Sequence, residues 1–136
     1  MSEQTNIDLM KAIYGAFNRG DLQSVLANIA PDAEWVNYGP DSVPYCGNFN
    51  GRSSDFFKAM GESMTGLSVA IERYIASGDF VATEGRLRAT ARGTGVAIDS
   101  PISHFFTFRG GKIASWRGYS DTAALAAAQG GQAASA

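Results

Sequence analysis

Apolar residues recur at helical spacing in the first half of the chain. Between residues 6 and 18 the apolar positions lie three or four apart: Ile7, Met10, Ile13, Tyr14 and Phe17. This spacing predicts an amphipathic helix of about three turns, capped by Thr5 or Asn6. The segment Arg19-Gly20-Asp21 then predicts a helix end at the glycine and a new N-cap at Asp21.

Two further helices are expected from the same periodicity. Apolar positions predict a short helix over residues 21–29, which ends before Pro31-Asp32. A third helix is expected over residues 53–64, opening at Ser53-Ser54-Asp55. Its apolar stripe consists of Phe56, Phe57, Met60 and Met64. We interpret this stripe as core rather than as a cofactor-binding surface.

Elsewhere the pattern changes to the alternation that is typical of strands. A short strand is expected over residues 33–38. The glycine- and proline-rich loop that follows, residues 39–51, is long and aromatic enough to form a lid or rim. Four more strands are expected at residues 67–76, 80–91, 96–108 and 113–119. Short glycine-rich turns divide these four segments, so neighbouring strands should pair as antiparallel hairpins.

Three helices followed by a run of strands predict an α+β fold. A chain of 136 residues with 45% hydrophobic content can bury one core and still leave a cavity. We expect a single domain over residues 1–128, in which the three helices pack on a strongly curved, mixed or antiparallel sheet. This cone-shaped α+β barrel would enclose a pocket. Residues 121–125 are expected to form a terminal helical turn, and residues 129–136 a flexible C-terminal tail.

Charge and composition exclude several classes of partner. The formal charge is −2 with only 11 Lys and Arg residues, so neither nucleic acid nor a membrane surface is expected as a partner. No apolar run approaches the ~20 residues that span a bilayer, and the polar first residues do not resemble a signal peptide, so we expect a cytoplasmic protein. Cys46 and His104 are the only cysteine and histidine, which argues against a disulfide or a zinc site.

His104 is the first candidate for chemistry because it lies in an otherwise aromatic segment. In a strand His104, Phe106 and Phe108 share one face. If that face lines the pocket, a neutral imidazole there can donate a hydrogen bond to a developing enolate or accept a proton. A hydrogen-bonded structural histidine is equally compatible with the sequence.

The 80–91 strand alternates between charged and small apolar residues. Its charged positions, which we assign to the outer face of the sheet, are Glu84, Arg86, Arg88 and Arg92. The small positions Gly85 and Ala89 are expected to face the pocket and leave room for a ligand. The charged set is compatible with a solvated surface or with ion pairs between two copies of the chain.

Five motifs and the order of the predicted helices and strands resemble the SnoaL-like branch of the nuclear transport factor 2-like superfamily. This branch is related to polyketide cyclases and ketosteroid isomerases. The motifs are Tyr14 to Phe17 before Arg19-Gly20-Asp21, Trp35 on the first strand, Pro44-Tyr45-x-Gly47 before Gly51-Arg52, His104-x-Phe106-x-Phe108 before Gly111-Lys112-Ile113, and Tyr119-x-Asp121. The resemblance spans residues 7–125 and implies the cone fold. It also implies a homodimer through the outer sheet face. It does not fix the reaction, because the superfamily includes isomerases, cyclases, dehydratases, epoxide hydrolases and binding domains.

Residue by residue, the resemblance to ketosteroid isomerases implies an electrophile at His104, where those enzymes carry an oxyanion-stabilising acid. Their general base falls on or near Asn37, whose carboxamide cannot abstract a proton from carbon. Their tyrosine donor falls on or beside Ile13, next to Tyr14. We therefore expect Asn37 and Tyr14 to orient a substrate rather than to act as base and acid.

The other enzymes of the superfamily fit less well. The epoxide hydrolases' Tyr-x-Asn motif resembles Trp35-Val36-Asn37, but their charged residues fall at Gly85, Leu87 and Gly118. The polyketide cyclases' acid also falls near Gly118. Asp121, three residues further on, could replace it or simply cap the terminal helix. Asp41 is interpreted as a turn residue of the 39–51 loop.

Together these inferences predict a cofactor-independent enzyme of the isomerase, cyclase or lyase type, acting by acid–base chemistry on a hydrophobic carbonyl compound. The candidate catalytic residues are His104, Asn37 and Asp121. The candidate substrate-binding residues are Tyr14, Trp35, Tyr45, Phe57, Met60, Leu87, Phe106 and Trp116. The alternatives are a non-catalytic ligand-binding or accessory dimer of the same fold, and a scaffold that binds a protein through its sheet.

Overall fold

The computed structural model describes residues 2–130, so the predicted tail beyond Gly130 lies outside the described residues. Helices and strands follow one another in the order α1 (Glu3–Asn18), α2 (Leu22–Ala27), β1 (Ile29–Asn37), β2 (Gly47–Asn48), α3 (Ser53–Ser63), β3 (Met64–Ser77), β4 (Phe80–Ala91), β5 (Ala97–Arg109), β6 (Lys112–Ser120) and α4 (Thr122–Ala128). The predicted α+β class is confirmed.

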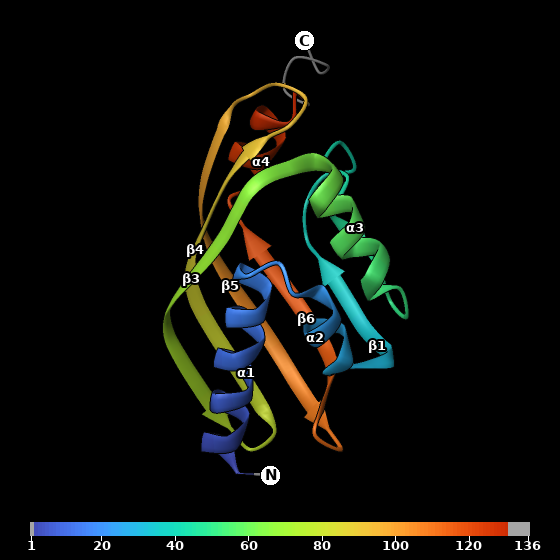
Figure 1. Ribbon diagram of the computed structural model, residues 1–136, viewed down its shortest axis with the longest axis vertical. Helices are drawn as coiled ribbons and strands as arrows, with labels where there is room; N and C mark the ends of the chain where they lie inside the picture. The colour runs from blue at the N-terminus through green and yellow to red at the C-terminus, as the bar shows by residue number, and fades with distance from the viewer. Residues whose placement is uncertain (1, 131–136) are drawn as a thin grey trace.

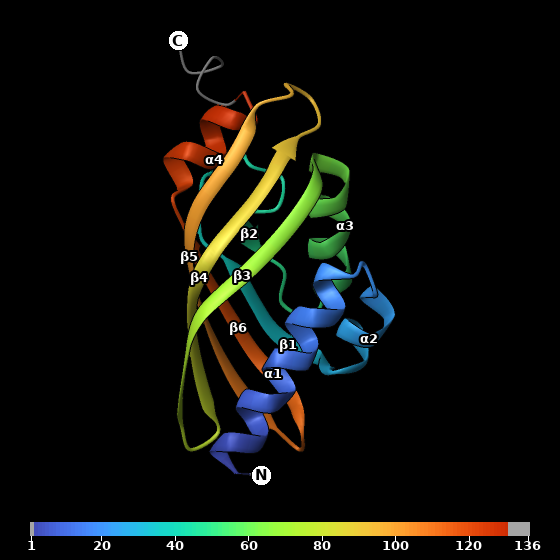
Figure 2. The ribbon, with the colours of Figure 1, turned by 60° about the vertical axis from the view of Figure 1, so that its left-hand side comes forward.

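One six-stranded sheet organises the molecule, with the strand order β2-β1-β6-β5-β4-β3. The three predicted hairpins from β3 to β6 are confirmed as antiparallel pairs, whereas β1 runs parallel to β6. The sheet is therefore mixed. Figures 1 and 2 show the long strands bending along their length, with α1, α2 and α3 on one face of the sheet and α4 at one end. The sheet is not closed, and the space between it and the three helices holds the core.

Two predicted boundaries near the N-terminus are wrong. α1 begins at Glu3 rather than Asn6, because Ser2 is the cap: the backbone N–H of Thr5 donates to Ser2 Oγ over 3.0 Å. Asn6 lies inside the helix and is 1% exposed. α2 ends at Ala27, and Ile29 is already the first residue of β1.

Pro31 belongs to a strand instead of ending a helix. The pairing of β1 with β6 is irregular between Ile29 and Glu34, and Pro31 lies in this interval. A proline has no N–H to donate to a sheet, so a strand tolerates it where the regular pairing is interrupted. The loop over residues 39–51 also contains a strand. Its residues Gly47–Asn48 form β2, which pairs with the end of β1.

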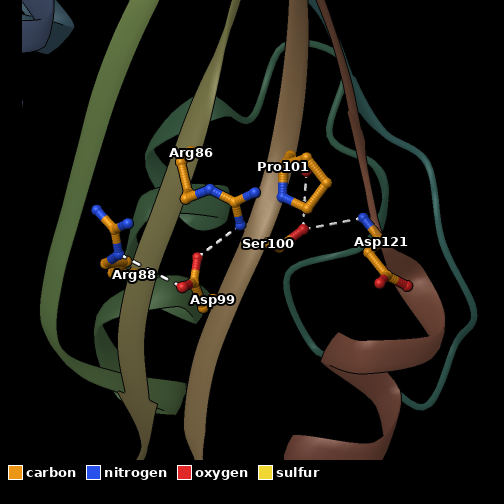
Figure 3. Close-up of polar contacts among 6 residues, drawn as sticks. All are labelled: Arg86, Arg88, Asp99, Ser100, Pro101 and Asp121. Atoms are coloured by element: carbon orange, nitrogen blue, oxygen red, sulfur yellow. Dashed lines mark hydrogen bonds and ion pairs between the residues drawn. The ribbon is translucent and has the colours of Figure 1, made fainter.

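The predicted alternation of β4 is confirmed within the strand. Gly85, Ala89 and Ala91 are buried, while the charged residues face outward. These form ion pairs within the chain: Arg73 with Glu84 (3.2 Å), Arg86 with Asp99 (2.7 Å) and Arg88 with Asp99 (3.5 Å), the last two drawn in Figure 3.

Two expectations for this strand are wrong. Arg92 lies beyond the end of β4, where its Nε donates to the Gly61 carbonyl of α3 over 2.9 Å. Gly85 does not make room for a ligand, because a Cβ at this position would collide with the backbone of Ala70 and Ile71 in β3. The glycine instead lets the two strands approach closely.

Candidate functional site

A cavity of about 80 Å³ lies between the concave face of the sheet and the helices. Its lining is mostly apolar and comes from α1, α2, α3, α4 and strands β1 and β3–β6. All eight predicted substrate-binding residues belong to the lining, together with two of the predicted catalytic residues: Tyr14, Trp35, Tyr45, Phe57, Met60, Leu87, Phe106, Trp116, His104 and Asn37. The volume admits a few water molecules, so a larger ligand has to displace lining side chains.

His104 is part of a short chain of hydrogen bonds at the cavity wall. Tyr14 Oη, from α1, lies 2.7 Å from His104 Nδ1 on β5 and 2.9 Å from Thr83 Oγ1 on β4. Thr83 and His104 are direct partners in the β4–β5 pairing, so both side chains leave the sheet on its inner face. The Tyr14 and His104 rings are nearly parallel, with 5.9 Å between their centroids. The tyrosine hydroxyl thus links the His104 ring to the Thr83 hydroxyl.

Burial keeps both rings neutral. Removal from water disfavours the charged form of His104 and lowers its pKa to about 3. The pKa of Tyr14 is raised well above its ordinary value, again chiefly by burial. Near neutral pH, His104 therefore presents an uncharged imidazole to the cavity. Within residues 2–130 its second ring nitrogen, Nε2, has no hydrogen-bond partner.

Asn37 is held by the loop that follows β1. Its Nδ2 donates to the Tyr45 carbonyl over 2.9 Å and lies 3.9 Å from Cys46 Sγ. Burial raises the pKa of the Cys46 thiol to about 11, so this cysteine stays protonated and is not a nucleophile near neutral pH. The carboxamide oxygen of Asn37 points toward Gly118, since a Cβ on that glycine would lie 2.7 Å from it.

Aromatic rings form the rest of the wall. The Trp35 and Trp116 rings stack with centroids 4.8 Å apart, and Phe56 packs 5.0 Å from Trp116. Trp35 Nε1 is buried and has no partner among the described residues, and the same is true of Ser120 Oγ. Both residues line the cavity.

Asp121 is placed as a helix cap. One carboxylate oxygen accepts a hydrogen bond from the backbone N–H of Ala124 over 3.2 Å, and its own N–H donates to Ser100 Oγ over 2.9 Å (Figure 3). Asp121 is not in the cavity lining, and neither is the exposed Asp41. Among the described residues, no Asp or Glu side chain lines the cavity.

Thr83 and Ser120 are polar site residues that the sequence analysis did not single out. Thr83 had a usable signal, because it alternates in phase with Gly85 and Leu87 and so belongs to the inner face. Ser120 had the same signal, because it alternates in phase with Trp116 and Gly118, but it lies one residue beyond the predicted strand and immediately before the Asp121 cap.

Two classes of site have no support in the described part of the chain. No three His, Cys, Asp or Glu side chains there gather into a group that could hold a metal ion. None of the helices formed by residues 2–130 combines the length and apolar character that crossing a membrane requires.

Solved structures with the same arrangement of helices and sheet place the chain in the nuclear transport factor 2-like superfamily. One from Burkholderia pseudomallei, of unknown function, is 27% identical, with a TM-score of 0.82 over 94% of this chain and 98% of that one. One from Burkholderia xenovorans is 30% identical, with a TM-score of 0.80 over 95% and 98%. TerC, whose structure was solved with polyporic acid, is 25% identical, with a TM-score of 0.82 over 92% and 98%.

Within that superfamily the chain belongs to the SnoaL-like domain family, whose family model matches residues 10–116. The resemblance drawn from the five motifs is thereby confirmed. The comparison with curated proteins gave no match.

Proposed function

We propose that the protein is a cofactor-independent enzyme that binds a hydrophobic carbonyl compound in the cavity and stabilises negative charge on its oxygen. One observation carries the proposal: a neutral His104 in an apolar wall, with Nδ1 bonded to Tyr14 and Nε2 left for a ligand. A donor placed in such a water-poor cavity favours a developing enolate over the ground-state carbonyl. Asn37 lies across Gly118 from His104, and its carboxamide oxygen points toward this glycine, where it is available to accept a hydrogen bond from the ligand.

The absence of a carboxylate from the described lining restricts the chemistry. His104 Nδ1 is engaged with Tyr14, so we assign charge stabilisation to His104 and proton removal to a weak base from solution, such as a carboxylate or phosphate ion. The proton leaves the carbon beside the carbonyl for that base, which becomes its conjugate acid, and the electron pair moves to the oxygen. Returning a proton to another carbon gives an isomer. A weak base suffices only for an acidic C–H bond, which favours substrates such as 1,3-dicarbonyl compounds.

A relative supports a small organic ligand in this fold. TerC, with 25% identity over nearly the whole chain, was solved with polyporic acid. The apolar lining around His104 is suited to such a ligand, and its methionines Met10 and Met60 can move aside for it.

The test is proton exchange at the carbon of a probe ketoester. The protein is mixed with ethyl 2-methylacetoacetate in heavy water, and loss of the C2 proton signal is followed by NMR. Faster exchange than in buffer, lost in His104→Gln, is the expected result. Exchange at the rate of buffer alone contradicts enzymatic action on this class of compound.

The second candidate is a non-catalytic domain that binds a hydrophobic ligand. The lack of a carboxylate in the described cavity lining favours it. Binding is measured independently of turnover, because the two tryptophans of the chain, Trp35 and Trp116, both line the cavity and report occupancy by fluorescence. Binding without accelerated exchange favours this second function.

We further propose a homodimer that forms through the outer face of the sheet. A strip of aromatic side chains supports it: Phe80 packs on Phe105 (5.9 Å between centroids), Phe105 on Tyr119 (5.5 Å) and Tyr119 on Tyr38 (4.9 Å). Tyr38 and Tyr119 are each 43% exposed. Contiguous exposed apolar surface of this kind is typical of an interface. Arg86 and Arg88 already pair with Asp99 within the chain, so the aromatic strip would supply the contact.

A further inference from the structure

The chain of hydrogen bonds from Thr83 through Tyr14 to His104 limits where the imidazole proton can be. Each of the two hydroxyls and the neutral imidazole carries one proton, and the chain contains two hydrogen bonds, at 2.9 and 2.7 Å. Two of the three protons therefore serve these bonds. The third is left over, and its place depends on the direction in which the chain runs.

In one direction Thr83 donates to Tyr14 and Tyr14 donates to His104 Nδ1. The imidazole proton is then on Nε2, the nitrogen without a protein partner. In the other direction Nδ1–H donates to Tyr14 and Tyr14 donates to Thr83. The hydroxyl proton of Thr83 is then left over, and Nε2 carries only a lone pair.

Burial decides between the two directions. Thr83 is 3% exposed, and among the described residues its hydroxyl bonds to Tyr14 alone. The second direction strands a buried donor without an acceptor, which proteins avoid. A third arrangement, in which both neighbours donate to Tyr14, strands the tyrosine's own proton in the same way. The first direction leaves its spare proton at the cavity, where water or a ligand can accept it.

We propose that Thr83, acting through Tyr14, fixes His104 as the Nε2–H tautomer, so that the cavity presents a permanent hydrogen-bond donor to its ligand. Thr83 and Tyr14 are then positioning residues, and the ligand class is one that carries an acceptor oxygen, as a ketone, enolate or phenolate does. Trp35 Nε1 and Ser120 Oγ, the buried donors of the described lining that have no partner, agree with this class. The inference deepens the proposed function and rests on it only for the identity of the ligand.

The tautomer is measurable without any ligand, because His104 is the only histidine of the chain. Protein labelled with 15N-histidine gives one pair of ring-nitrogen signals, which distinguish a protonated from an unprotonated nitrogen. At pH 7 the wild type is expected to show a protonated Nε2 and an unprotonated Nδ1. A protonated Nδ1 in the wild type overturns the proposal.

Variants test the part played by Thr83. Thr83→Val keeps the shape and removes the hydroxyl, so the ratio of Nε2–H to Nδ1–H tautomer is expected to fall about tenfold. Thr83→Ser restores the hydroxyl and should restore the ratio, which a purely packing role would not produce. An unchanged ratio in Thr83→Val contradicts the role of Thr83. Folding of each variant is checked by its amide spectrum. Tyr14→Phe is a second variant that breaks the chain of hydrogen bonds between Thr83 and His104.

The ligand class is tested separately with a matched pair of probes. Cyclopentanone and methylenecyclopentane have the same ring, and only the first carries an acceptor oxygen. We expect cyclopentanone to quench the tryptophan fluorescence at a concentration at least fivefold lower. Equal concentrations contradict the acceptor class. If the tautomer is as proposed but no ketoester exchanges its proton, the proposed function fails and the positioning of His104 stands.

Discussion

Asn37 and His104 lie on opposite sides of Gly118, and each is its direct partner in the sheet. Asn37 pairs with Gly118 across the parallel β1–β6 ladder, and His104 pairs with it across the antiparallel β5–β6 ladder. Three successive strands thus present an amide, a gap and an imidazole to the cavity. The Trp116 ring occupies the gap, because a Cβ on Gly118 would collide with it.

Replacement of Gly118 by alanine is expected to disturb this arrangement. The added methyl group meets Trp116 and Asn37, so we expect a loss of about 1–3 kcal/mol in the free energy of unfolding, measured by urea denaturation. The matched control is Gly61→Ala in α3, where a Cβ meets nothing within 4 Å. There, alanine should leave stability unchanged or raise it by up to about 1 kcal/mol. Equal effects in the two variants contradict the crowding at Gly118.

Replacement of His104 by glutamine should weaken ligand binding without unfolding the protein. The variant keeps a polar side chain but loses the imidazole donor, so cyclopentanone affinity is expected to fall about three- to tenfold, as for one neutral hydrogen bond. Fluorescence of Trp35 and Trp116 measures the change. Methylenecyclopentane serves as the control, since its binding should not depend on His104. A loss of affinity that is equal for both probes would point to collapse of the cavity instead.

The stability of the protein should fall as the pH drops below about 6.5. His104 has a pKa of about 3 when folded and an ordinary value of 6.5 when unfolded, so between these values the unfolded chain binds more protons. The contribution of the neutral ring is complete above pH 6.5 and is lost progressively toward pH 3. Between pH 7 and pH 5 we expect a loss of about 2 kcal/mol.

The glutamine variant isolates this effect from that of the carboxylates. Urea unfolding at pH 7 and pH 5 is compared for the wild type and His104→Gln, which has no imidazole to titrate. The wild type should lose about 2 kcal/mol more than the variant between the two pH values. A difference below about 0.5 kcal/mol contradicts a His104 that stays neutral in the folded protein.

The proposed dimer depends on the aromatic strip of the outer sheet face. Phe105→Glu places a charge at its centre, between Phe80 and Tyr119, and is expected to shift the protein from dimer to monomer in light scattering. Leu22→Glu is the control, because Leu22 is also exposed but lies on α2, away from this face. A monomeric wild type, or a variant that stays dimeric, contradicts the proposal.

The sequence predicted the order and type of the elements because their periodicity is strong. The cap at Asp21 and the hairpins from residue 67 onward are local features, and their turns are visible in the chain. The boundary at Ile29 was missed, because residues 22, 25, 26 and 29 lie on one helical face whether or not the helix continues. Only the pairing of β1 with β6, a contact distant in the sequence, makes a strand of Ile29.

For the site, the sequence identified the wall but not the relation between its polar groups. Alternation placed His104 on the inner face with Phe106, and both line the cavity. The contact between Tyr14 and Thr83 joins a helix to a strand many residues away, so no local pattern contains it. Gly85 was misread for a related reason, since the crowding that requires a glycine comes from β3.

The parallel pairing of β1 with β6 has a consequence for how the protein folds. The hairpins from β3 to β6 connect neighbours in the sequence and can form early, whereas Asn37 meets Gly118 only after most of the chain has been synthesised and ordered. Closing so long a loop costs entropy that local contacts do not, which makes it a late and slow step. We therefore expect the binding cavity to be completed late during refolding, and ligand capture to lag behind the formation of secondary structure.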